Sequence, residues 1–302
     1  MSLALAVAGY FLTSAEGTFS CSGFAATTLD GTLLFCLSLL CYIPVALVIG
    51  SFHLFERRNA WLPALFLWLV AISVSLHGNL LTAFSVLLVV IVVALLLNCQ
   101  PEALLERLLY TIFAITGSAA FLLPQFVFLL LPLIVALFVL NLFSVKRMLA
   151  ALLGFATPFW IVYGIVYVWP QADVLLTPFE SGIQSLFAFR VAVANPCIVV
   201  VSVMELMVLL PAVAVFASSQ VPSKPLLRRR MIFLMFLEFY LIPLSWFVNN
   251  DFELFYAWRL PLVAVMASYL FTVKQTKASN IYFIFINLFW LSAAALCLCL
   301  SR

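Results

Sequence analysis

The chain has 302 residues, of which 67% are hydrophobic and 8% are charged, and its formal net charge at pH 7 is +3. An ordinary soluble domain carries roughly 25% charged residues, so this composition excludes a soluble globular protein and favours an integral membrane protein. The small positive charge gives no reason to expect nucleic acid as a partner.

Apolar segments separated by short polar breaks predict an all-α polytopic transmembrane helix bundle of about ten spans, with the lipid bilayer as its main partner. We place the spans at 33–52, 61–76, 79–97, 108–123, 126–143, 148–168, 196–217, 231–248, 258–273 and 281–300. No polar stretch is long enough for a soluble domain. Residues 1–302 are therefore expected to form a single integral membrane domain, in which 1–32 are a short apolar start with an outer polar segment and 33–302 are the helix bundle.

Breaks that contain Lys and Arg alternate along the chain with breaks that contain almost none. Eleven of the 14 Lys and Arg residues lie in five breaks, at 53–60, 98–107, 144–147, 218–230 and 274–280. The positive-inside rule predicts that these five breaks are cytoplasmic. The breaks 169–195 and 249–257 then lie on the outer side. Arg190, Arg259 and Arg302 are the basic residues outside this pattern.

Two acidic residues, Glu205 and Glu238, lie inside apolar spans, where a charged side chain costs several kcal/mol. The two spans are consecutive and antiparallel, so the carboxyls can approach each other near the middle of the membrane. A facing pair would share a proton and suits proton coupling or cation binding. Alternatively, each carboxyl is protonated and bonded to a backbone carbonyl or to a polar neighbour such as Asn141, Asn287 or Ser202, which fixes helix packing. We place no Lys or Arg at the same depth, so an internal salt bridge is not expected.

A second group of charged residues is predicted at the outer surface. Its members are Asp173, Glu180, Arg190, Asp251, Glu253 and Arg259. Polytopic glycosyltransferases that use polyprenyl-linked sugars place acidic residues on outer loops, and two carboxylates one residue apart can share a hard cation. Alternatively, these acidic residues have no shared role. The positive-inside rule concentrates Lys and Arg in cytoplasmic loops, so the charged residues of outer loops are mainly acidic.

Other chemical signals are weak. The seven cysteines form no C-x-x-C pair, and the chain has no nucleotide-binding loop or dinucleotide fingerprint. We therefore assign no catalytic residue, cofactor, metal site or nucleotide partner.

Several features are assigned to packing and anchoring. The run Gly117–Ala120 offers a smooth helix face for close approach, and Pro158 is expected to kink its span. Aromatic residues at two span ends are predicted to be interfacial anchors. They are Tyr163, Tyr167 and Trp169 on one span and Phe255, Tyr256 and Trp258 on the other.

A resemblance covers about a fifth of the chain. The residues that carry it are Gly117-Ser118, Leu122, Pro124, Phe143-Ser144, Lys146-Arg147, Gly154 and Thr157-Pro158-Phe159. In their order and spacing this region resembles the central part of a family of uncharacterised polytopic inner-membrane proteins of Bacteroidota, a domain of unknown function. The resemblance implies location in the inner membrane of a diderm bacterium and carries over no established activity.

Three functions remain open. The first is transport or flipping of a cell-envelope precursor, with Glu205 and Glu238 as a proton-linked pair facing one polar cavity. The second is a non-catalytic membrane scaffold or subunit of an envelope complex, which predicts a well-packed bundle with an apolar groove for a membrane-protein partner. The third is a polyprenyl-linked glycosyltransferase-like enzyme, which predicts that the outer charged residues converge on one groove. We favour transport, and an enzymatic function is the least favoured.

Overall fold

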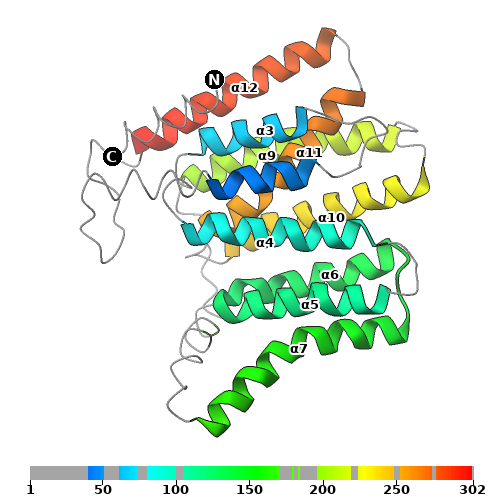
Figure 1. Cartoon of the computed structure of the whole chain (residues 1–302). Helices are drawn as coiled ribbons and strands as arrows, with labels where there is room; N and C mark the ends of the chain where they lie inside the picture. Colours follow the sequence, from blue (N-terminus) through cyan, green and yellow to red (C-terminus); the bar gives the residue numbers. More distant parts are fainter. Residues whose placement is uncertain are drawn as a thin grey trace.

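The computed structural model describes residues 40–50, 61–73, 80–99, 105–169, 179, 183, 196–218, 224–247, 252–273 and 277–300. The described residues form helices and the turns between them, with no strand among them, which confirms the predicted all-α class. A helical segment, Leu40–Gly50, comes first. It is followed by α3 (Trp61–Ile72), α4 (Leu80–Leu97), α5 (Leu105–Leu122), the short 3₁₀ helix η2 (Pro124–Phe126), α6 (Val127–Val139), α7 (Val145–Val168), α9 (Pro196–Ser218), α10 (Pro225–Phe247), α11 (Phe252–Val273) and α12 (Lys277–Leu300) (Figure 1).

Five of these helices are long and apolar enough to cross a membrane. The qualifying stretches are Leu80–Leu97, Leu105–Leu122, Val145–Val168, Val199–Ser218 and Glu253–Phe271. A helix needs about 20 mostly apolar residues to cross the hydrocarbon core. These stretches support the prediction of a transmembrane protein, whereas the total of about ten spans stays a prediction.

Five helices begin earlier than the sequence pattern predicted. α5 and α7 begin three residues early, at Leu105 and Val145, α12 begins four residues early, at Lys277, and α10 and α11 begin six residues early, at Pro225 and Phe252. Arg107 and Arg228–Arg230 therefore lie on the first turns of helices and not in loops. Arginine is a good helix former, and its long apolar stem can lie along a helix while its charged head reaches an interface.

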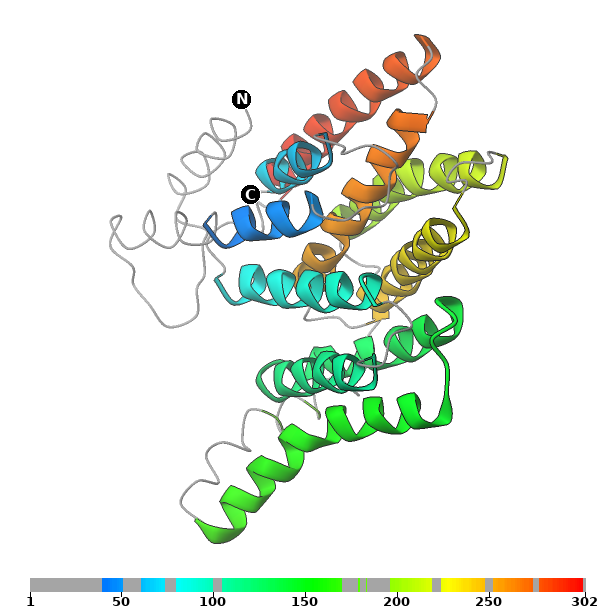
Figure 2. The ribbon, with the colours of Figure 1, turned by 45° about the vertical axis from the view of Figure 1, so that its right-hand side comes forward.

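α11 is the central helix of the bundle. In the 18-residue apolar window of its stretch Glu253–Phe271, 94% of the residues are buried inside the protein, against 11% in the window of α7. α11 packs against α3, α4, α9 and α10, and Figure 2 shows it crossing among them, while α7 lies at the edge.

Burial corrects the prediction of interfacial anchors at the start of α11. Phe255, Tyr256 and Trp258 are at most 4% exposed, so they face other helices and not the membrane surface. The Trp258 indole Nε1 donates a hydrogen bond to Ser85 Oγ (2.9 Å), and the Tyr256 hydroxyl bonds the Ser73 hydroxyl (2.7 Å). Buried Trp and Tyr keep a partner for their polar atom, and α4 and the end of α3 supply it. Tyr163, Tyr167 and Trp169 on α7 are exposed, as anchors would be.

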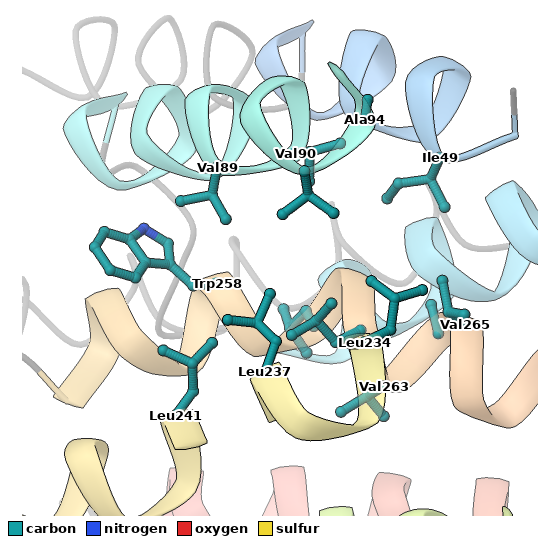
Figure 3. Close-up of a cluster of buried hydrophobic side chains, with 14 of the residues drawn as sticks. Ile49, Val89, Val90, Ala94, Leu234, Leu237, Leu241, Trp258, Val263 and Val265 are labelled. Carbon is teal, nitrogen blue, oxygen red and sulfur yellow. The ribbon is translucent and has the colours of Figure 1, made fainter. Parts of the chain in front are cut away.

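An apolar layer joins α4 to α10 and α11. Figure 3 shows Val89 and Val90 of α4 facing Leu234 and Leu237 of α10, with Trp258 of α11 beside them. All five side chains are buried. Because lipid tails are as apolar as these side chains, the layer is stabilised by close packing more than by exclusion from water.

α5 and α7 approach each other through two glycines. A Cβ at Gly117 of α5 would clash with the backbone carbonyl of Phe155, and one at Gly154 of α7 would clash with the backbone carbonyl of Tyr110. The Tyr110 hydroxyl and Thr157 Oγ1 lie 2.9 Å apart in a hydrogen bond across the same contact. The predicted close-packing face at Gly117 is therefore confirmed. Beyond this contact α7 bends, and its second half turns away from the bundle (Figures 1 and 2), as Pro158 within the helix predicts.

The turn between α6 and α7 is held by arginines. Asn141 has a positive φ of 57°, a left-handed conformation that Asn tolerates at a helix C-terminus, and Leu142 N–H closes the turn on Leu137 O at 2.8 Å. With its amide oxygen turned toward α10, Asn141 accepts hydrogen bonds from Nη1 (2.7 Å) and Nη2 (2.8 Å) of Arg229. Arg147 Nη1 donates to Leu142 O at 3.2 Å.

The end of the bundle at this turn gathers positive charge, and we name it the basic end. It comprises Cys99 after α4, the turn 141–147 and the stretch 224–230 at the start of α10. Arg228 lies 5.4 Å above the ring of Phe216, near the end of α9. Burial raises the pKa of the Cys99 thiol to about 11, although neighbouring Arg230 acts in the opposite direction. These contacts bring together breaks that are far apart in the sequence.

Candidate functional site: a buried ion triad

Three charged side chains meet inside the bundle. Arg259 of α11 forms an ion pair with Glu205 of α9, through Nη2 and Oε2, and a second one with Glu238 of α10, through Nε and Oε1 at 3.3 Å. Arg259 Nη1 also donates a hydrogen bond to Ser245 Oγ at 3.1 Å. Arg259 and Glu205 are 0% exposed and Glu238 is 1% exposed. We name these three charged residues the ion triad.

Helix geometry explains how they meet. Glu205 lies nine residues after the start of α9, Glu238 nine residues before the end of α10, and Arg259 seven residues after the start of α11. At about 1.5 Å per residue, each lies about 10–14 Å from the same end of the bundle, because consecutive helices run antiparallel. The planar guanidinium carries five N–H donors and can serve two carboxylates at once.

The ion triad is unbalanced in charge. Two carboxylates and one guanidinium sum to −1 when all three are ionised. Within the described residues, Glu205 Oε1 and Glu238 Oε2 are buried and accept no hydrogen bond. An uncompensated charge in the interior of a protein is costly. One bound proton, or one monovalent cation, would bring the group to neutrality.

Two predictions about Arg259 are wrong. It was expected at the outer surface, and no basic residue was expected at the depth of the glutamates. The first error comes from the boundary of α11, which begins at Phe252 and so places Arg259 two turns inside the helix. The second follows from the first. One feature of the sequence points to the correct position: Arg259 lies outside the five basic breaks. A basic residue inside a membrane span usually has an acidic partner, and Glu205 and Glu238 are the acidic residues within spans.

Of the predicted outer charged residues the structure describes Glu253 and Arg259, and it does not bring these two together. Glu253 is exposed on the first turn of α11, while Arg259 of the same helix is buried in the ion triad. Asp173, Glu180, Arg190 and Asp251 lie outside the described residues. Arg259 is therefore not part of the predicted group of charged residues at the outer surface.

The polar contacts continue from the ion triad toward one end of the bundle. Next to Ser245 on α10, Trp246 donates its indole Nε1–H to Ser202 Oγ of α9 at 2.8 Å. Ser202 is 0% exposed and lies three residues before Glu205, on the same face of α9. The sequence suggests Ser202 as a polar neighbour of the glutamates, and the structure places it one turn from Glu205 with Trp246 as its donor. Ser245 and Trp246 are not predicted at the site, since isolated serines and tryptophans are ordinary in membrane helices. Among the described residues no group of three His, Cys, Asp or Glu could hold a metal ion.

Comparisons of the whole chain with protein-family models, with curated proteins and with solved structures find no match.

Proposed function

We propose that this chain is a multi-pass membrane protein that couples transport to the binding and release of one proton at the ion triad. The observation that carries the proposal is the excess of one carboxylate over guanidinium in a fully buried group. A proton is the smallest species that can neutralise this excess, and its release creates a buried charge that favours a different packing of the helices. A site that is neutral in one state and charged in the other can drive a conformational cycle.

Helix geometry adds support to the proposal. Pro211 and Pro243 lie inside α9 and α10, within six residues of Glu205 and Glu238. Proline removes a backbone hydrogen bond and weakens a helix locally. Interrupted helices beside an intramembrane charge are typical of transporters, where they frame the site near the middle of the membrane.

We further propose about ten spans, an inner-membrane location with the basic end in the cytoplasm, and a cell-envelope precursor as the transported or flipped molecule. The clustering of the α4, α6, α7 and α10 ends at the basic end agrees with one cytoplasmic face. The choice of cargo follows from the inner-membrane location that the sequence resemblance implies, because envelope precursors must cross that membrane.

Labelling of introduced cysteines tests the orientation. We expect the thiol of Ser223→Cys, next in sequence to the basic end, to resist an impermeant thiol reagent in intact cells and to react after the membrane is opened. The thiol of Ala172→Cys should react in intact cells. The opposite pattern would reverse the proposed orientation without affecting the ion triad.

Replacing either glutamate with glutamine tests proton coupling. In Glu205→Gln or Glu238→Gln the remaining carboxylate balances Arg259, so the protein no longer needs a bound proton. We expect the infrared band of a protonated carboxyl, present in the parent at neutral pH, to disappear from both variants. Transport-dependent growth should fail while folding and insertion are retained.

The matched control for this experiment is Glu253→Gln, since Glu253 is an exposed carboxyl on α11. It should leave both the band and growth unchanged. If Glu205→Gln and Glu238→Gln support growth and envelope integrity as the parent does, under conditions where deletion of the gene does not, proton coupling is ruled out.

A membrane scaffold or complex subunit is the second candidate, and one observation favours it. An apolar groove runs between α4 and α5, lined by residues that include Phe84, Leu88 and Ile115. A scaffold would use the ion triad to fix helix packing and the groove to hold a partner helix. The same glutamine variants separate the candidates, because a scaffold keeps its function when the charge balance of the triad is restored without a proton.

A further inference from the structure

The surroundings of the ion triad differ in polarity between its two sides. Toward the end of the bundle where α9 and α11 begin lie Ser202, Ser245 and Trp246, all bonded within or beside the triad. Toward the basic end, α9 continues with the buried apolar residues Val208 and Leu209. A proton moves through hydroxyls and water and not through packed aliphatic side chains, so the two sides are not equivalent routes.

α11 shows the same asymmetry. Its polar residues Tyr256 and Arg259 lie in its first two turns, and beyond Arg259 the next buried hydroxyl residue is Ser268. Ser268 lies nine residues after Arg259, which is about 14 Å along the helix. The residues between them are apolar, and five of them, Leu260, Val263, Ala264, Val265 and Met266, are at most 3% exposed. This layer separates the triad from the basic end.

Trp246 occupies the polar side of the triad. It is the penultimate residue of α10 and is half-buried, whereas Ser202, to which it donates, is fully buried. The hydrogen bond therefore joins the end of α10 to α9 directly above Glu205. The half-buried indole therefore lies against the buried Ser202, one helical turn from Glu205.

No other carboxylate competes for the proton on the helices around α11. Over the residues that the structure describes, α3, α4 and α12 contain no acidic residue, and α9 and α10 contain only Glu205 and Glu238. On α11 itself Glu253 is exposed at the first turn. The basic residues Arg228–Arg230 of α10 and Lys277 of α12 lie at the far ends of their helices from the triad.

We propose that the ion triad exchanges its proton only with the end of the bundle where α9 and α11 begin, and that the Trp246–Ser202 contact is the gate on this route. The proposal rests on the proposed function for the identity of the proton, but the access route has its own test. In the proposed orientation this is the outer side, so the structure corresponds to a closed state that opens outward. Trp246 is a positioning residue, because it touches Ser202 and not the reacting carboxyls.

The experiment uses the full chain with its seven native cysteines replaced, reconstituted into lipid vesicles. The thiol of Ser202→Cys reports access to the triad through its reaction with a small, impermeant, cationic methanethiosulfonate reagent. The thiol of Ser223→Cys reports which face of the vesicle carries the basic end. Ala212→Cys is the matched control, since Ala212 is 0% exposed on α9 but lies on the apolar side of the triad.

We expect Ser202→Cys to react slowly, and only from the face opposite the one at which Ser223→Cys reacts. The thiol of Ser202→Cys is only a weak hydrogen-bond acceptor, so in this background Trp246→Phe, which keeps an aromatic ring, should change the rate less than about twofold. Trp246→Ala removes the ring that covers position 202 and should raise the rate several-fold. Ala212→Cys should stay unreactive from both faces in every background.

Any one of three results would overturn the gate. Ser202→Cys could react from the face that carries the basic end, its rate could be the same in both Trp246 variants as in the parent, or Ala212→Cys could react equally fast. The infrared band of the protonated carboxyl is recorded on the same Trp246→Phe protein. If that band persists in the glutamine variants while labelling follows the expected pattern, the proton-linked function fails and the route stands. If the band responds to the glutamine variants and labelling does not follow the pattern, only the gate fails.

Discussion

Replacing Arg259 with alanine should cause the largest loss of stability of any change to the ion triad. The substitution leaves Glu205 and Glu238 in the core without a cation, and breaking a buried ion pair by removing one partner costs about 3–5 kcal/mol. That is a large part of a typical stability of about 5–15 kcal/mol. We expect little monodisperse Arg259→Ala protein after detergent extraction, and a clearly lower Tm for what is recovered.

The loss of yield and Tm in Arg259→Ala should come from the unbalanced charge in the core and not from the missing arginine side chain itself. In the triple variant Arg259→Met with Glu205→Gln and Glu238→Gln, no charge remains, and most of the lost yield and Tm should return. The double variant Glu205→Gln with Glu238→Gln leaves Arg259 unpaired and should be unstable. Parental stability of Arg259→Ala, or an unstable triple variant, would show that burial of net charge is not what governs this site.

The glycine contact between α5 and α7 should give the second largest effect. Gly117→Ala places a methyl group against the carbonyl oxygen of Phe155, and Gly154→Ala places one against the carbonyl oxygen of Tyr110. Backbone cannot rotate away as a side chain can, so the two helices must separate. Overpacking of this kind costs about 1–3 kcal/mol at each site, and each variant should unfold at a lower temperature than the parent.

Gly164 provides the control for this prediction. It lies in the same helix, α7, and a Cβ there would meet no atom within 4 Å. Gly164→Ala should therefore leave the Tm unchanged or raise it slightly, because alanine is favoured over glycine in a helix by about 0.5–1 kcal/mol. If all three variants behave alike, helix propensity and not close packing explains the effect.

Two kinds of sequence signal differ in how well they predicted the structure. Long apolar runs predicted α4, α9 and α12 to within a few residues, because about 20 apolar residues in lipid can only form a helix. α10 and α11 begin several residues before the predicted spans, because the apolar pattern that predicts a span stops at charged or polar residues. Helices continue through such residues when the first turn reaches an interface or when the charge finds a partner inside the protein.

The amino-acid sequence alone predicted part of the candidate site. Glu205 and Glu238 stand out since few acidic residues occur within apolar spans, and their placement on consecutive helices predicts that they lie close together. Arg259 was assigned to the surface because one sequence gives no information about which face of α11 meets α9 and α10. Trp246 carries no distinguishing pattern, and only the contact between α9 and α10 pairs it with Ser202.

By itself, the sequence determined the membrane class of this protein, its helical character and the presence of two acidic residues where charge is costly. These properties follow from composition and local spacing, which each segment carries independently of the others. Only the tertiary structure decided that one arginine joins both glutamates, that two glycines set the distance between α5 and α7, and that α11 lies at the centre. Those outcomes depend on which helix faces meet. That is fixed by packing among segments far apart in the sequence, as in the Ser73–Tyr256 contact, which joins residues 183 positions apart.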